Sequence, residues 1–261
     1  MAVTMSNEDV KNPEQMDALF KAGAHFAFSR SRRHPSMAPF IFGVKNKVEI
    51  FDLEKVADML EETKEHMKKL GTERKKILFV SGKNEAREVV KNAAISISMP
   101  YVAGRWIGGT LTNFPEIKKR ISRMIDLSEK REKGELSKFT KLERLYIDRE
   151  IEDLEDTFGG LRGMEALPHA MFVVDTRHEE IAVAEAKKMG IPVIGILNSD
   201  CNANNADHFI PGNDSSVASI TYFIQELVGA YQEGLKSAPA PKETSKEAPK
   251  KAERTGEKNK T

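Results

Sequence analysis

Cysteine is nearly absent from this chain of 261 residues, which has one thiol, at Cys201. A single cysteine excludes an internal disulfide, and the spacing of the six histidines supports neither a zinc nor a magnesium site. No stretch approaches the roughly 18 consecutive apolar residues of a membrane helix. Residues 1–13 lack the basic-then-apolar order of a signal peptide. These absences predict a cytoplasmic protein with no bound cofactor and no membrane partner.

The net charge is only +1, but the charges are unevenly distributed along the chain. Residues 168–235 hold nine acids against three Lys or Arg. Residues 18–48 contain no acid and six basic side chains: Lys21, Arg30, Arg32, Arg33, Lys45 and Lys47. We expect positive side chains to gather at one end of the molecule, where they would attract phosphate. Chance clustering on solvated faces is the alternative.

Strand-like and helix-like segments alternate along much of the chain. Apolar runs at residues 76–81, 170–175 and 191–196 have the length of buried strands, and helical spacing is found at 84–97, 178–189 and 214–229. This order predicts the α/β class, with a mostly parallel sheet covered by helices on both faces.

The residues before this alternating part have their own expected elements. We expect a helix at 15–24, an irregular basic stretch at 25–39, and two strands, 40–44 and 48–51, around a tight turn. A further helix should begin after Asp52 and end at Gly71.

Residues 113–158 carry no strand signal but two helical seams. Apolar side chains are spaced 3-4-3 in the first half and 4-3-4 in the second, at Phe114, Ile117, Ile121, Met124, Ile147, Ile151, Leu154 and Phe158. With Gly134 between the halves, this predicts a protruding antiparallel coiled-coil hairpin. Residues 118–144 hold ten Lys or Arg and five acids, so this arm can lie along a phosphate backbone. An arm that binds proteins is the alternative.

The domain organisation follows from these segments. We expect residues 14–112 and 159–235 to form the α/β domain, with residues 113–158 inserted as the hairpin. Residues 1–13 and the basic tail 236–261 have too few apolar side chains to offset their ordering entropy, so we expect disorder there.

The sharpest local motif is residues 104–113, at a strand end just before the hairpin. Gly108 and Gly109 allow close backbone approach, and Arg105 can bind a phosphate. Trp106 either packs in the core or stacks on a base, and Asn113 closes the motif. The motif is not a phosphate loop, because no Gly-Lys-Ser/Thr is present. A second turn, residues 210–214, predicts Asp214 as the cap of the last helix.

One cluster resembles an enzyme site. Asp175 ends a strand next to Arg177, His178 and Glu179, at the edge where open α/β sheets bind ligands. No nucleophile–base pair or metal set can be recognised in it, and ordinary strand-end residues look the same.

Five motifs, in this order, resemble the bacterial type of the small-subunit ribosomal protein S-two family. They lie at residues 21–26, 39–47, 105–113, 167–170 and 210–214, and the resemblance runs from about Met16 to about Gly234. It implies a Rossmann-like or flavodoxin-like domain with a protruding coiled-coil hairpin. It also implies a place near the head–body junction of the small subunit, in contact with ribosomal RNA and neighbouring ribosomal proteins. In many bacteria the family also docks the large mRNA-binding protein S-one.

The chain departs from the family pattern in three places. Where the family reads His-Phe-Gly-His, this chain has Phe28 in place of the second histidine. The loop after Ile196 has amides in place of two or three carboxylates, and Ser215 replaces a second aspartate. These changes weaken any metal-binding or acidic role of these segments and leave the docking of protein S-one open.

The resulting hypothesis is a structural RNA-binding protein of the small subunit, with no small-molecule substrate. The side chains expected to contact RNA are Arg30, Arg32, Arg33, Lys45, Lys47, Arg105, Lys118, Lys119, Arg120 and Arg123. The competing classes are an α/β enzyme acting on a phosphorylated or nucleotide substrate near Asp175, and a coiled-coil scaffold that binds no RNA.

Overall fold

The computed structural model describes residues 13–238. In chain order its helices and strands are α1 (Pro13–Lys21), β1 (Phe26–Ser29), β2 (Ile41–Lys45), β3 (Val48–Phe51), α2 (Leu53–Thr72), β4 (Ile77–Val80), α3 (Asn84–Ser96), β5 (Tyr101–Val102), α4 (Phe114–Glu132), α5 (Lys141–Phe158), β6 (Ala170–Val174), α6 (Glu180–Lys188), β7 (Val193–Leu197), β8 (His208–Pro211) and α7 (Val217–Ser237). Disorder is expected at Pro13 and from Lys236 onward, but Pro13 begins α1, and Lys236 and Ser237 belong to the last turn of α7. Residues 1–12 and 239–261 of the two expected tails lie outside the described residues. No helix within residues 13–238 combines the length and apolar character that crossing a bilayer requires.

The central sheet has five parallel strands in the order β5-β4-β6-β7-β8. Numbered within this sheet, the order is 2-1-3-4-5, which is the flavodoxin-like arrangement. The strand order reverses between β4 and β6, which is where folds of this type bind ligands at the carboxyl ends of their strands. The predicted α/β class with a mostly parallel sheet is confirmed.

Helices cover both faces of this sheet. Along β4, Ile77 and Phe79 point into one buried cluster and Leu78 and Val80 into another, so the strand is buried on both sides. The first cluster contains α2, α3 and α7, and the second contains α6 and the base of the hairpin. Each fully buried side chain of this size contributes about 1.5–3 kcal/mol.

A second, smaller sheet precedes the parallel one. Its antiparallel order is β1-β3-β2, and the turn between β2 and β3 places Asn46 (φ 52°) and Lys47 (φ 66°) in the left-handed region, as a two-residue hairpin turn requires. The prediction that residues 25–39 are irregular is wrong for β1. Its four residues are too short to show an alternating pattern, and pairing with β3 makes them a strand.

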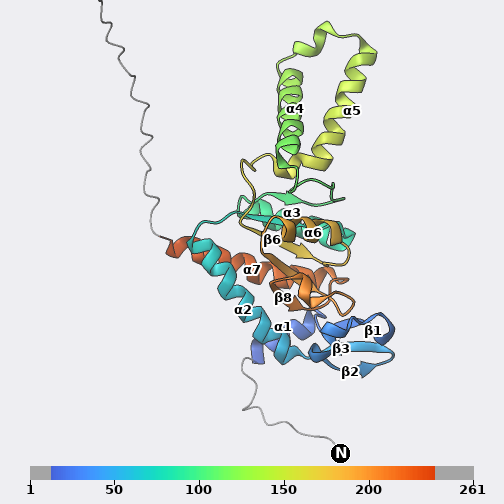
Figure 1. The fold of residues 1–261 in the computed structure, drawn as a ribbon, viewed down its shortest axis with the longest axis vertical. Helices are drawn as coiled ribbons and strands as arrows, with labels where there is room; N and C mark the ends of the chain where they lie inside the picture. The colour runs from blue at the N-terminus through green and yellow to red at the C-terminus, as the bar shows by residue number, and fades with distance from the viewer. Residues whose placement is uncertain (1–12, 239–261) are drawn as a thin grey trace, which may run out of the picture.

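The predicted helical hairpin is confirmed. Phe114, Ile117, Ile121 and Met124 of α4 are all buried, as are Ile151 and Phe158 of α5. Gly134 lies between the helices with φ 72°, and Thr140 begins α5 with a capping box to Glu143. Figure 1 shows the hairpin projecting from one end of the body, with the small sheet at the other end.

The packing of α2 on α7 overturns one predicted boundary. α2 does not end at Gly71 but continues to Thr72. Gly71 is buried at the point where α7 comes closest to α2. A Cβ at Gly71 would collide with the Tyr231 carbonyl, and one at Gly234 would collide with the Lys68 carbonyl. Glycine is needed here for close contact between helices, not to end one.

Gly234→Ala should therefore force the two helices apart. We expect a loss of about 1–3 kcal/mol in the free energy of unfolding, the usual cost of overpacking. The matched control is Gly229→Ala in the same helix, where an added Cβ meets nothing within 4 Å. That change should stabilise slightly, because alanine favours helix. Urea unfolding of both variants tests this, and equal effects would contradict it.

Candidate functional site

The loop between β5 and α4 is built around one buried carboxylate, Glu185 of α6. Glu185 accepts backbone N–H hydrogen bonds from Gly109 at 2.6 Å, Leu111 at 3.0 Å and Thr112 at 3.2 Å. The Thr112 hydroxyl and the Trp106 indole N–H donate to it as well, both at 3.3 Å. One side chain thus anchors most of the motif at residues 104–113.

The charge of Glu185 is part of this anchor. Burial opposes its ionisation, yet its pKa lies below the ordinary value because the N–H groups of Gly109, Leu111 and Thr112 stabilise the carboxylate. An amide has only one acceptor oxygen and would turn its own N–H groups toward these donors.

The other predicted structural residues of the loop have distinct surroundings. Trp106 is buried, 7% exposed, so of its two possible roles the structure has core packing. Gly109 has φ 93°, a conformation that favours glycine, whereas Gly108 has open space around it. The Asn113 N–H donates to the Gly109 carbonyl at 2.8 Å, but its side chain makes no capping bond to α4.

Arg105 is exposed at the start of this loop, beside a crevice of 330 Å³ at the carboxyl ends of the strands. Glu179 lies buried in the crevice wall, where it accepts the Gly82 N–H at 2.6 Å and contacts His178 Nδ1 at 2.7 Å. In related folds a ligand's phosphate occupies such a place. Here a carboxylate of the chain itself accepts the N–H.

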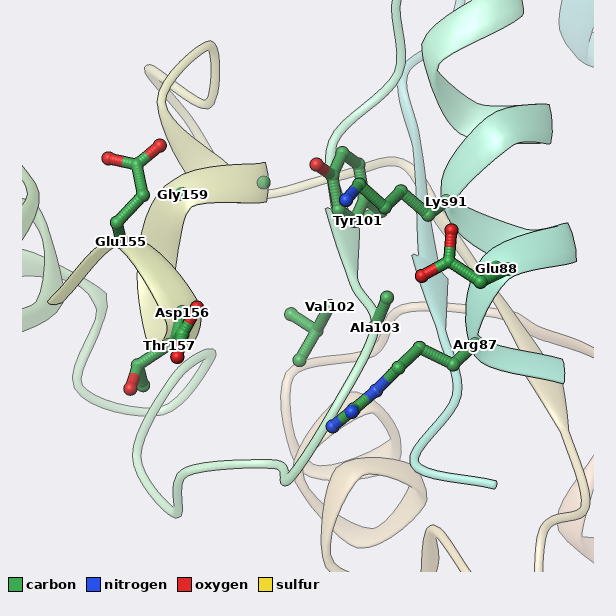
Figure 2. Close-up of a pocket in the computed structure, with 11 residues that line it drawn as sticks. Arg87, Glu88, Lys91, Tyr101, Val102, Ala103, Glu155, Asp156, Thr157 and Gly159 are labelled. Atoms are coloured by element: carbon green, nitrogen blue, oxygen red, sulfur yellow. The ribbon is translucent and has the colours of Figure 1, made fainter. Parts of the chain in front are cut away.

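Arg87 is a basic residue that sequence reasoning missed. It lines the crevice beside Arg105 and also a second one, of 390 Å³, on the other side of β5. In Figure 2, Arg87 and Lys91 of α3 lie on one side of β5 and Glu155 of α5 lies on the other. The α3 wall of this second crevice also carries Glu88, so it holds charges of both signs, whereas the α5 wall holds the acids Glu155 and Asp156.

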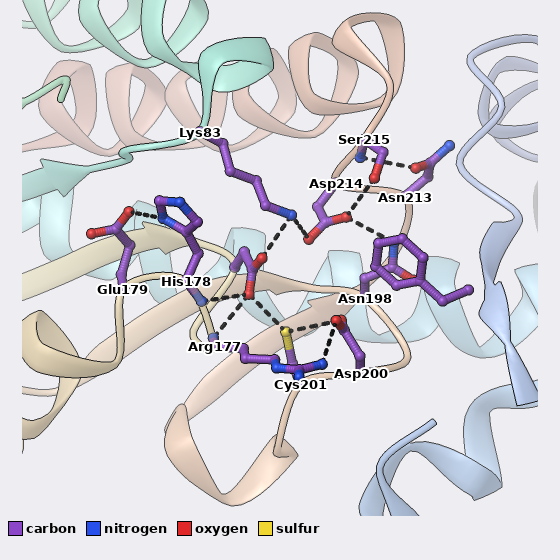
Figure 3. Close-up of polar contacts among 12 residues, drawn as sticks. Lys83, Arg177, His178, Glu179, Asn198, Asp200, Cys201, Asn213, Asp214 and Ser215 are labelled. Atoms are coloured by element: carbon purple, nitrogen blue, oxygen red, sulfur yellow. Dashed lines mark hydrogen bonds and ion pairs between the residues drawn. The ribbon is translucent and has the colours of Figure 1, made fainter. Parts of the chain in front are cut away.

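A buried ionic cluster lies at the ends of β4, β6 and β8 (Figure 3). Lys83 Nζ lies 2.6 Å from Asp175 Oδ2 and 2.5 Å from Asp214 Oδ2, and Asn198 donates to Asp214 at 2.7 Å. Burial disfavours the ammonium, but the two carboxylates outweigh it and raise the pKa of Lys83 above its ordinary value. Losing one member of such a cluster is costly, because a buried charge is left unpaired.

This cluster corrects the predicted role of Asp214. Asp214 does not cap α7, which begins at Val217 after Ser216. The carboxylate is instead fully buried against Lys83. Asp175, with φ 67°, also accepts from the Cys201 thiol at 3.2 Å. Burial raises the pKa of that thiol, so Cys201 is not an activated nucleophile.

The enzyme-like residues are therefore bound to each other. Asp175 holds Lys83 and the N–H groups of Arg177 and His178, and the Arg177 guanidinium pairs with Asp200 at 3.0 Å. Within residues 13–238, no three His, Cys, Asp or Glu side chains converge as metal ligands would.

The basic side chains of the small sheet fall into two groups. Arg30, Arg32, Lys45 and Lys47 are exposed, and the Arg32 guanidinium lies over the Phe28 ring, 4.9 Å from its centroid. Arg33 instead pairs with the buried Glu49 at 2.9 Å. Its charge therefore compensates a buried carboxylate.

The four basic side chains of α4 predicted to contact RNA, Lys118, Lys119, Arg120 and Arg123, are exposed but differ in their partners. Arg123 pairs with Glu150 of α5 at 2.6 Å, Lys119 pairs with Glu116 at 2.7 Å, and Lys118 donates to the Glu165 carbonyl at 3.3 Å. Arg120 has no ion pair within the described part of the chain.

The structure does not bring these two groups together. The small sheet and the hairpin lie at opposite ends of the body (Figure 1), so the prediction of a single basic end is wrong. Charge counts along the sequence could not show this, because the direction of the hairpin depends on a tertiary contact, the anchoring of its base by Glu185.

Glu185 itself was missed by sequence reasoning, although a signal was present. It is a lone acid on the apolar face of α6, next to Ala182 and Ala186, which are buried. An acid at a buried position of an amphipathic helix implies internal hydrogen-bond donors.

Glu185→Gln should destabilise the protein by about 3 kcal/mol, the order expected when charge-assisted bonds are lost. Because the folded state lowers the pKa of Glu185, its contribution is present above the unfolded value of about 4.3 and is lost as pH falls through the folded value. The stabilities of the parent and the variant should therefore converge as the pH falls from about 4.3 through the lower folded pKa.

Glu180→Gln on the same helix is the control, since Glu180 is exposed. Chemical unfolding from pH 3 to pH 7 measures all three proteins. A pH-independent difference between Glu185→Gln and the parent would contradict the assignment.

The sequence is similar to known proteins over nearly its whole length. Residues 19–234 match the family described as Ribosomal protein S2. The chain is 41% identical over 238 residues to the small ribosomal subunit protein uS2 of Parabacteroides distasonis. The aligned region covers 90% of this chain and 86% of that relative. Both matches include the parallel sheet, the loop around Glu185 and the hairpin. The chain therefore belongs to the ribosomal protein S2 family, as a structural constituent of the small ribosomal subunit.

Proposed function

We propose that this member of the family binds small-subunit ribosomal RNA through two separated basic surfaces. The sheet-end surface consists of Arg30, Arg32, Lys45 and Lys47. The hairpin surface consists of Arg105, Lys118, Lys119, Arg120 and Arg123. Arg33 belongs beside the first surface, where it fixes Glu49. The observation that carries the proposal is that Arg30 and Arg120 are exposed without an ion-pair partner among the described residues.

Two surfaces at opposite ends suit a protein that joins two segments of one folded RNA. Arginine and lysine contacts to phosphate position a protein without reading sequence, so recognition should follow RNA shape. The body, residues 14–112 and 159–235, would set the distance between the contacts. The insertion, residues 113–158, would carry one of them outward.

The competing functions are weaker. Membership in a family of non-enzymatic ribosomal proteins removes the α/β enzyme acting on a phosphorylated or nucleotide substrate. The internal pairing of Lys83, Asp175 and Glu179 agrees with this. A scaffold that binds no RNA would have no use for exposed unpaired guanidiniums at both ends.

The double variant Arg30→Ala/Arg32→Ala should weaken binding to purified small-subunit RNA while leaving the fold intact. Each lost phosphate contact lowers the slope of log affinity against log salt by about 0.7–0.9, so the slope should fall by about 1.4–1.8. Filter binding across a salt series measures this.

Lys69→Ala/Lys188→Ala is the matched control, with the same loss of charge at exposed positions outside both surfaces. An unchanged slope in the arginine variant, or an equal fall in the control, would count against the sheet-end surface.

We further propose that the exposed phenylalanines of the N-terminal part dock protein S-one. Phe42 is 78% exposed, Phe20 62% and Phe26 48%. His25 stacks on Phe20, with ring centroids 4.6 Å apart, and contacts Phe26 at 4.1 Å. Clusters of exposed aromatic side chains are typical of protein–protein interfaces.

Phe42→Ser should reduce the amount of protein S-one that sediments with small subunits about tenfold, the order of losing one aromatic anchor. Ile95→Ser is the control, because Ile95 is 55% exposed on α3, away from the small sheet. If S-one remains at parental levels in the Phe42 variant, it does not dock there.

A further inference from the structure

The outer half of α5 exposes three large apolar side chains on one face. Leu142 is 59% exposed, Leu145 45% and Tyr146 59%. Their spacing, i, i+3 and i+4, places them side by side on the helix surface. Clustered apolar side chains on a surface mark interaction sites far more often than isolated ones do.

This face is not the seam of the hairpin. The seam positions of α5 include Ile147, Ile151 and Phe158, which at about 100° per residue lie on the opposite side of the helix from Leu145. Ile151 and Phe158 are buried, as a seam requires. The exposed apolar side chains therefore turn away from α4, and nothing in the described residues covers them.

The same face changes character toward the body. Following the helical spacing from Tyr146, it continues through Arg149 to Glu152, Asp153 and Asp156, all of which are exposed. The face is thus apolar at the outer end of α5 (Figure 1) and acidic near its base. Across the hairpin, α4 carries the exposed basic side chains.

We propose that the face formed by Leu142, Leu145, Tyr146, Arg149, Glu152, Asp153 and Asp156, here called the α5 outer face, docks a basic protein of the small subunit. The apolar end would bury against that partner, and the three acids would pair with its lysines or arginines. This inference rests on the proposed function only for the placement of the chain in the small subunit.

RNA is the weaker occupant of the α5 outer face. Glu152, Asp153 and Asp156 outnumber the exposed Lys141 and Arg149 on this side of the helix, so its net charge is negative, which repels phosphate and favours a basic protein surface. A second copy of this chain also fits poorly. Packed in parallel, two outer faces would oppose acids to acids; packed antiparallel, they would oppose acids to leucines. The hairpin is thus two-sided, with α4 toward RNA and α5 toward protein.

Photo-crosslinking in intact small subunits tests this directly. The full chain would carry benzoylphenylalanine in place of Tyr146, and a second sample would carry it in place of Arg120. After irradiation and nuclease digestion, mass spectrometry identifies the partner. We expect the Tyr146 position to link to one protein with an excess of Lys and Arg, and the Arg120 position to link to RNA.

A Tyr146 crosslink to RNA or to a second copy of this chain would overturn the proposal. So would no crosslink at Tyr146 when Arg120 gives one. If the chain does not sediment with small subunits at all, the proposed function fails together with this inference. If it does and Tyr146 links to no protein, only this inference fails.

A pair of variants separates docking from folding. Leu142→Ser/Tyr146→Ser should leave thermal unfolding unchanged, because both side chains are exposed, and should reduce the yield of the linked protein about tenfold with the probe at position 145. Glu152→Lys/Asp153→Lys should reduce it as well. The control is Ile95→Ser/Ile181→Ser, which removes two exposed apolar side chains elsewhere. Equal yields in all variants would contradict the α5 outer face as a docking site.

Discussion

The hydrogen bonds that the Glu185 carboxylate accepts from the loop at residues 104–113 hold the helical hairpin to the α/β body. The loop connects the edge strand β5 to the hairpin, so its conformation sets where α4 begins and where Arg105 points. A buried carboxylate is costly unless hydrogen bonds satisfy it, and here N–H and hydroxyl donors from four residues do so.

Buried carboxylates satisfied by groups of the chain itself also occur at the strand ends, where an enzyme of this fold would hold its ligand. Glu179 takes the Gly82 N–H, and Lys83 is shared by Asp175 and Asp214. The charges at this edge of the sheet are thereby satisfied within the chain, whereas Arg30 and Arg120 are exposed and have no ion pair among the described residues. A protein built in this way is suited to holding phosphates at its surface. Among the described residues, the polar groups at the strand ends are paired with one another and not set up to turn over a substrate.

Much of the fold could be predicted because local patterns determine it. The apolar runs of β4, β6 and β7 are long enough to identify as buried strands, and the 3-4-3 spacing from Phe114 to Met124 identifies a seam. What failed depended on contacts between distant residues. β1 is a strand only because β3 pairs with it, Gly71 is required by the approach of Tyr231, and Asp214 is held by Lys83. Neither the role of Glu185 nor the separation of the two basic surfaces can be seen from positions along the chain.

A structure of the small ribosomal subunit with this chain in place would test the account most directly. The account predicts RNA phosphates within hydrogen-bonding distance of Arg30 or Arg32 at one end and of Arg105 or Arg120 at the other, with Glu185 still holding the loop. Ribosomal RNA packed only against other parts of the chain, with those four guanidiniums in solvent, would contradict it.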